Sequence, residues 1–182
     1  MTQSEAATFA YLYRAFYKNV YAFCGRRVDA DSVDDLVADV FLTVWRRIAD
    51  APSGDGALGW LYRISHLVTS NHWRGSNRRK KLDERLESIG IQPVPLLQDQ
   101  VLVREQVREV VAAAQHLRER DVEILRLSLW EHLSLDEIGA VLDINPNAAK
   151  QRLHRARNNL VREYERANKT AVAPAAQEGG VQ

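Results

Sequence analysis

The sequence predicts an all-α protein with two small helical domains joined by a flexible linker. Apolar residues recur three and four positions apart through most of the 182 residues, which is the period of an amphipathic helix. Residues 83–100 interrupt this period with Gly90, Pro93 and Pro95, as a linker between domains would. Because neither an alternating strand pattern nor an internal repeat occurs, no β-sheet is expected.

The predicted helices follow from their apolar stripes. The clearest stripe runs from Val33 to Ile48, and Asp31 or Ser32 can cap the start of that helix. Turn-forming residues at 50–56 separate it from the next helix. In chain order the predicted helices span residues 6–28, 31–48, 57–75, 101–116 and 118–130, followed by a pair of helices within residues 134–160.

The composition is that of a globular protein, with 46% hydrophobic residues and 25 Lys and Arg against 24 Asp and Glu. No apolar run approaches the roughly 18 residues of a membrane-spanning helix, and the first residues lack the basic-then-apolar order of a secretion signal. Cys24 is the single cysteine, which excludes an intramolecular disulfide and a cysteine metal cluster. We therefore expect a cytoplasmic protein without a metal ion or other cofactor.

The near-zero net charge hides a segregation of charge along the chain. Residues 51–81 and 144–170 are both basic, and acidic stretches precede and separate them. A basic segment is either a solvated helix face or a surface for a phosphate backbone. Two such segments, each with its own helical pattern, favour a nucleic acid as the partner.

A helix-turn-helix pattern begins at Ser134. Ser134 and Glu137 form a capping box, in which the Ser hydroxyl accepts from a free backbone amide and Glu137 reaches back to the cap. Ala140 is small enough for a second helix to cross closely. Residues 143–144 then form a short turn, where Asp143 tolerates the left-handed conformation.

The second helix of this pattern suits the major groove of DNA. Asn145 can cap it, and Pro146 suits its first position, where a missing amide costs nothing. One packing stripe consists of Ala149, Leu153, Ala156 and Leu160. The other faces hold cations and amides, with no acid from residue 144 to residue 162, so they suit the acceptors and phosphates of a groove.

Four segments form a further pattern: residues 35–45 (DLVADVFLTVW), 60–65 (WLYRIS), 133–139 (LSLDEIG) and 150–157 (KQRLHRAR). Taken in this order, they resemble the extracytoplasmic-function (ECF) sigma factors of bacterial RNA polymerase. The resemblance covers about residues 6–166 and implies no enzymatic activity. It also implies that an anti-sigma factor is a possible partner.

The resemblance implies a division of the chain into four parts. Residues 5–82 would be sigma domain two, which binds the clamp helices of the polymerase β′ subunit and the −10 promoter element. Residues 83–100 would be the linker. Residues 101–167 would be sigma domain four, which reads the −35 element and packs on the β-subunit flap. Residues 168–182 would be a disordered tail.

The resemblance also implies three sets of contact residues. The polymerase contacts are Asp35, Asp39 and Trp45, although core packing is an alternative role for Trp45. The −10 contacts are Leu58, Asn71, Trp73, Arg74, Arg78, Arg79 and Lys80, where the cations follow phosphates and Trp73 offers a stacking face. The −35 contacts are Asn147, Lys150, Gln151, Arg152, His154, Arg155 and Arg157.

Two departures from the family pattern concern turns. Residues 53–58 match the segment that holds a flipped-out promoter base in the family, and relatives often have an aromatic residue where this chain has Ala57 and Leu58. Asp143 stands where the family commonly has glycine.

Two other classes of protein are alternatives. A helix-turn-helix regulator of the response-regulator type would need an α/β domain in front, and residues 1–80 predict helices only. A metal-dependent hydrolase could use a cluster of Asp31, Asp34, Asp35 and Asp39, of which Asp31, Asp35 and Asp39 lie four residues apart. No histidine accompanies these acids, and no catalytic residue or metal ligand is therefore predicted.

Overall fold

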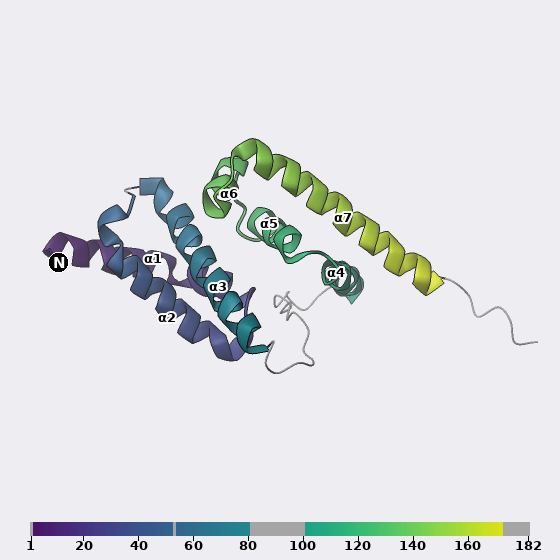
Figure 1. The fold of residues 1–182 in the computed structure, drawn as a ribbon, viewed down its shortest axis with the longest axis horizontal. Coiled ribbons are helices and arrows are strands. Elements are labelled where there is room, and N and C mark those ends of the chain that lie inside the picture. Colours follow the sequence, from purple (N-terminus) through teal and green to yellow (C-terminus); the bar gives the residue numbers. More distant parts are fainter. Residues whose placement is uncertain (1, 53, 81–100, 173–182) are drawn as a thin grey trace, which may run out of the picture.

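The computed structural model describes residues 2–52, 54–80 and 101–172, and every regular element in these residues is helical (Figure 1). The elements are α1 (Gln3–Gly25), α2 (Ala30–Arg46), α3 (Ala57–Lys80), α4 (Val101–Ala114), α5 (Glu119–Leu129), α6 (Leu135–Leu142) and α7 (Pro146–Val172), with short 3₁₀ turns at Ile48–Asp50 and Gly54–Gly56. The all-α prediction is confirmed for these residues. The predicted linker at 83–100 lies outside the described residues.

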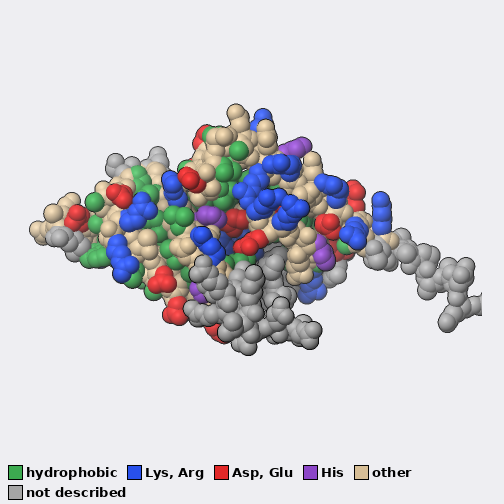
Figure 2. Space-filling model, in the orientation of Figure 1, with side chains coloured by type: hydrophobic (Ala, Val, Ile, Leu, Met, Phe, Trp, Pro, Cys, Tyr) green, Lys and Arg blue, Asp and Glu red, His purple; other side chains and the backbone are tan. Residues whose placement is uncertain are grey.

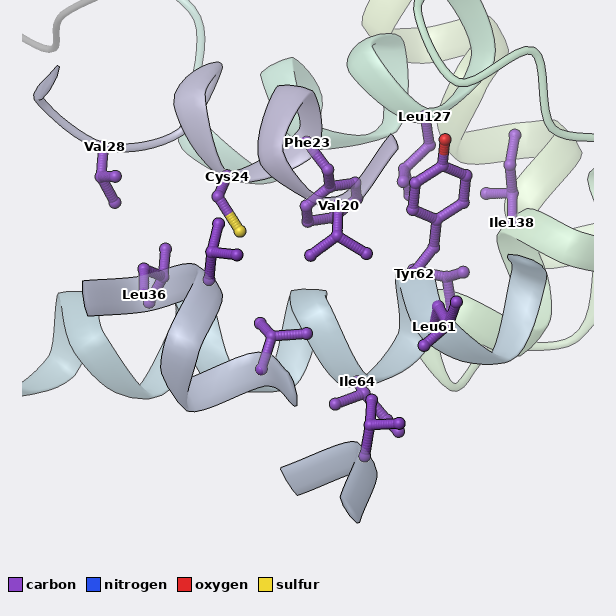
Figure 3. Close-up of a cluster of buried hydrophobic side chains, with 14 of the residues drawn as sticks. Val20, Phe23, Cys24, Val28, Leu36, Leu61, Tyr62, Ile64, Leu127 and Ile138 are labelled. Carbon is purple, nitrogen blue, oxygen red and sulfur yellow. The ribbon is translucent and has the colours of Figure 1, made fainter. Parts of the chain in front are cut away.

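Helices α1, α2 and α3 pack against one another and form the N-terminal bundle. Its interior contains the predicted stripe of α2, together with Val20, Phe23, Leu61 and Ile64 from its neighbours (Figure 3). The start of α2 differs from the prediction. The helix begins at Ala30 after Asp29, so Asp31 lies within its first turn and neither Asp31 nor Ser32 is the cap.

Helices α4 to α7 form the C-terminal bundle, in which α7 packs against the other three helices. Its buried stripe contains Ala149, Leu153 and Ala156, as predicted, and Leu160 is partly buried against the same core. Helix α7 continues to Val172, beyond residue 168, where the sequence predicts that the tail begins. Residues 173–182 lie outside the described residues.

The helix-turn-helix has the predicted caps and turn, first at the start of α6 and then between α6 and α7. The Ser134 hydroxyl accepts from the amide of Glu137 at 3.3 Å, and the Glu137 carboxylate accepts from the amide of Ser134 at 2.8 Å. The Ser134 hydroxyl also donates to this carboxylate at 2.7 Å, and this hydrogen bond, together with the one from the Ser134 amide, lowers the pKa of Glu137. Asp143 adopts the left-handed conformation with φ 57° and ψ 45°, and Asn145 caps α7 by accepting from the amide of Ala148 at 2.8 Å.

Gly139, and not Ala140, provides the close approach at this turn. A Cβ atom on Gly139 would lie 2.7 Å from the carbonyl oxygen of Ile144, whereas Ala140 is exposed. We expect Gly139→Ala to destabilise the C-terminal bundle by about 1–3 kcal/mol, because the backbone of the turn must move. Urea unfolding followed by circular dichroism measures this loss.

The matched control is Gly59→Ala in α3, since a Cβ atom there meets nothing within 4 Å. This substitution is expected to be neutral or slightly stabilising, because alanine favours a helix more than glycine does. Equal stabilities of the two variants would contradict the role assigned to Gly139.

Candidate nucleic-acid interface

The outer face of α7 carries amides at its crest and cations on both sides. Asn147, Gln151, His154 and Asn158 are exposed along this crest, and the side chains of His154 and Asn158 lie 3.1 Å apart. Lys150 and Arg157 flank the crest on one side, and Arg152 and Arg155 flank it on the other. Amides can read the edges of bases, and the flanking cations suit the phosphates on either side of a groove.

A groove of about 610 Å³ runs between α7 and the start of α5. Its arginines are Arg118, Arg120, Arg152, Arg155 and Arg162. Figure 2 shows Lys and Arg side chains gathered over this part of the molecule. The sequence did not identify Arg118 and Arg120, because only packing brings the start of α5 beside α7. Arg162 lies on α7 itself, beyond the predicted helix-turn-helix at residues 134–160. A surplus of arginine around residue 118 was the available signal.

Arg152 differs from the other predicted residues of this face because it is half-buried. Its Nη2 donates to the carbonyl oxygen of Arg120 at 3.0 Å, and its Nε is buried without a protein partner in the described part of the chain. Burial lowers the pKa of Arg152. The structure thus places Arg152 at the base of the groove and leaves Lys150, Arg155 and Arg157 exposed.

The predicted −10 residues are divided between two environments on α3. Asn71 and Arg74 are exposed, and Arg74 donates to the Asn71 side chain at 3.0 Å. Trp73 is partly buried, and its Nε1 donates to the carbonyl oxygen of Arg27 at 3.0 Å. Leu58 packs against the core. The side chains of Arg78, Arg79 and Lys80 lie outside the described residues.

The predicted polymerase contacts lie on the outer face of α2. Asp35 and Asp39 are exposed, and Trp45 is 37% exposed with its ring edge-on to Phe9 at a centroid distance of 4.8 Å. Trp45 therefore packs against Phe9 and still exposes part of its side chain to a partner. Among the described residues no group of three or more His, Cys, Asp or Glu side chains has a geometry that could hold a metal ion.

An apolar groove on the C-terminal bundle has no counterpart in the sequence prediction. Val110 of α4, Leu129 of α5 and the following Trp130 line it, and each is more than 40% exposed. Arg26 and the buried Arg126 also line it. Exposed apolar side chains gathered in one groove are typical of a protein interface.

These features define a class of protein, namely a two-bundle helical protein whose helix-turn-helix presents a nucleic-acid-binding face. Family models described as sigma-70 region 2 and sigma-70 region 4 match residues 12–79 and 108–160. The chain belongs to the sigma-70 family, within its ECF group of RNA polymerase sigma factors.

Curated relatives agree with this assignment. The ECF RNA polymerase sigma factor SigK of Mycolicibacterium vanbaalenii is 26% identical over 156 residues, which cover 84% of this chain and 80% of the relative. The ECF RNA polymerase sigma-E factor of Escherichia coli is 25% identical over 167 residues, covering 87% of each chain.

Solved structures share the fold. The sigma factor RpoE of Bartonella quintana, solved with the anti-sigma factor NepR, matches with a TM-score of 0.67 at 20% identity, covering 86% of this chain and 96% of that one. CnrH, solved with the cytosolic domain of CnrY, matches with a TM-score of 0.58 at 20% identity, covering 91% and 89%. None of the helices in the described ranges is both long and apolar enough to span a bilayer.

Proposed function

We propose that this chain directs the core RNA polymerase to particular promoters by contacting two promoter elements and the polymerase itself. The observation that carries the proposal is the outer face of α7, where amides and cations are exposed along a helix that a capped, glycine-dependent turn holds in place. This face would read the −35 element, with Asn147, Gln151 and His154 toward base edges and Lys150, Arg155 and Arg157 toward bases or phosphates.

The N-terminal bundle would serve the −10 element and the β′ clamp helices. Asn71 and Arg74 are exposed on α3, where an amide and a cation can bind the bases and phosphates of an opened DNA strand. Asp35, Asp39 and Trp45 would contact the clamp helices from α2. The apolar groove lined by Val110, Leu129 and Trp130 would receive the β-subunit flap, because exposed apolar side chains gather in it on the bundle that carries the helix-turn-helix.

The remaining parts of the proposal concern boundaries, partners and place. Residues 5–82 and 101–167 would act as the two domains, with 83–100 as the linker. An anti-sigma partner is proposed because RpoE, which shares the fold, was solved with the anti-sigma factor NepR. The chain would position the polymerase on DNA without catalysing a reaction. It would act in the cytoplasm, where bacterial polymerase and promoter DNA meet.

Run-off transcription with purified core polymerase on genomic fragments tests this function. We expect transcripts that start at a few defined sites and that depend on this chain alone. A helix-turn-helix regulator would produce such transcripts only when another sigma factor was already present. Absence of both a stable complex with core polymerase and any site-selective transcript would refute the proposal.

A further inference from the structure

The two bundles meet in a contact that resembles the interior of one domain. Helix α3 packs against α6. Tyr62 of α3, Leu127 of α5 and Ile138 of α6 are buried and belong to one continuous hydrophobic cluster (Figure 3). Each bundle thus removes apolar side chains of the other from water, as the core of a specific interface does.

A buried cation just after α1 strengthens this contact. Arg27 is 4% exposed; its Nε donates to Glu123 at 3.0 Å and its Nη1 donates to Glu131 at 2.8 Å. Its guanidinium lies 3.4 Å from the ring centroid of Phe23, and this ring stacks in turn on Tyr62. A cation of the N-terminal bundle is therefore held by two carboxylates of the C-terminal bundle, in charge-assisted hydrogen bonds.

Three further pairs surround Arg27 and join the same two bundles. They are Arg26 with Glu131 at 3.2 Å, His66 with Glu123 at 3.1 Å, and Arg63 with Asp143 at 3.3 Å. In all of these pairs the N-terminal bundle contributes the basic side chain and the C-terminal bundle contributes the carboxylate. We call this set the latch: Arg26, Arg27, Arg63, His66, Glu123, Glu131 and Asp143.

The latch brings residues predicted from the sequence for two separate promoter elements into one cleft. Trp73, predicted for the −10 element, and Arg152, predicted for the −35 element, both line an interdomain cleft of about 250 Å³. The two elements are named for positions about 25 base pairs apart, which is about 85 Å along DNA at 3.4 Å per base pair. Two side chains that line one cleft cannot reach both elements at once.

We propose that the free chain holds itself closed through the latch, and that it engages core polymerase and promoter DNA fully only after the latch opens. This inference rests on the proposed function for its consequence, but the closed state itself depends only on contacts within the chain. Polymerase would open the latch by binding the separated bundles more tightly than the closed pair. No anti-sigma partner is needed for this restraint.

A crosslink across the exposed pair tests the proposal without disturbing the buried pairs. The side chains of Arg63 and Asp143 are 48% and 89% exposed, so the double variant Arg63→Cys, Asp143→Cys leaves both cores intact. A short bis-maleimide then joins the two thiols in the full-length chain. Cys24 does not compete, because it is fully buried and burial raises its pKa to about 12, against the opposing effect of Arg27. The matched control is the same variant with both thiols capped by N-ethylmaleimide.

We expect rapid intramolecular crosslinking at high dilution, which reports the closed state directly. The crosslinked chain should bind core polymerase at least about tenfold more weakly than the capped chain and should lose run-off transcription. Failure to crosslink, or equal binding and transcription by crosslinked and capped chains, would overturn the latch. A third outcome is possible: the uncapped variant crosslinks readily, but the capped chain supports no selective transcript. That result would refute the proposed function and leave the closed state supported.

Discussion

Replacement of Arg27 by methionine is expected to destabilise the folded chain by about 3–5 kcal/mol, the range for removal of one partner of a buried ion pair. Glu123 and Glu131 would then face the interface without their shared cation, and the contact of the guanidinium with Phe23 would also be lost. Methionine keeps the length and apolar character of the arginine stem, so the loss reports mainly on charge. Urea unfolding at neutral pH, together with the distance between labels on the two bundles, measures the effect.

The charge state of Glu123 supports this expectation. Burial would raise its pKa, but Arg27 and His66 outweigh burial and hold the pKa at about 2. Glu123 is therefore ionised throughout the neutral range. Because its pKa in the folded chain is lower than in the unfolded chain, its contribution to stability is complete above about pH 4.5 and is lost as the pH falls toward 2. In the methionine variant burial acts on Glu123 without the opposing effect of Arg27, so the carboxylate must either stay charged without its main partner or take up a proton, and both changes cost stability.

Two control variants separate charge from general damage to the fold. Arg26→Met removes a side chain that is 20% exposed and leaves Glu131 paired with Arg27, so a smaller loss than that of Arg27→Met is expected. Adding Glu123→Gln and Glu131→Gln to Arg27→Met should restore part of the lost stability, because the two buried carboxylates that lost Arg27 are then neutral. Recovery is incomplete, because Arg26 and the buried Arg126 lose the carboxylates that face them. Wild-type stability of Arg27→Met, or no recovery in the triple variant, would show that the latch contributes little.

Local signals in the sequence predicted most of the helices and the helix-turn-helix. The spacing of Leu36, Val40 and Val44 follows from helix geometry alone, and the capping box at Ser134 depends on residues three positions apart. Such features need no knowledge of the rest of the chain, and the structure confirms them. The exposure of the cationic face of α7 follows in the same way from the apolar stripe on its opposite side.

Contacts between distant segments cannot be predicted from local patterns in the sequence. Arg27 and Glu123 lie 96 positions apart, and nothing near either residue indicates its partner. Trp73 had the pattern of a stacking residue, yet its indole N–H is engaged by the backbone at Arg27. The sequence pattern indicates Ala140 and not Gly139 as the site of close approach, because the position of the Ile144 carbonyl is a property of the folded turn. The candidate site was thus predictable for exposed residues of single helices, and less so where two bundles share a surface.

Neutralising the cations that flank the crest of α7 should have a large effect on DNA binding. In the double variant Arg155→Ala, Arg157→Ala, two exposed cations are lost, and each phosphate contact contributes about 0.9 to the slope of log K against log salt. We expect the slope to fall by about 1.8 and the affinity to fall similarly on every duplex. Fluorescence anisotropy on a duplex carrying the mapped −35 element and on a scrambled duplex, between 50 and 200 mM salt as an approximate range, measures both quantities.

Substitutions that remove base contacts should behave differently on the same pair of duplexes. Lys150→Ala and Gln151→Ala are expected to reduce the preference for the −35 element over the scrambled duplex by about 1–3 kcal/mol. Arg152→Ala should weaken binding with less change in preference, because Arg152 is half-buried and donates to the Arg120 carbonyl. The full-length chain can be used, since the crest of α7 stays exposed while the bundles are in contact. The contrary result is that Lys150→Ala, Gln151→Ala and Arg152→Ala all lower affinity equally on both duplexes. These side chains would then contact only phosphates, and the residues that recognise the promoter sequence would have to lie elsewhere.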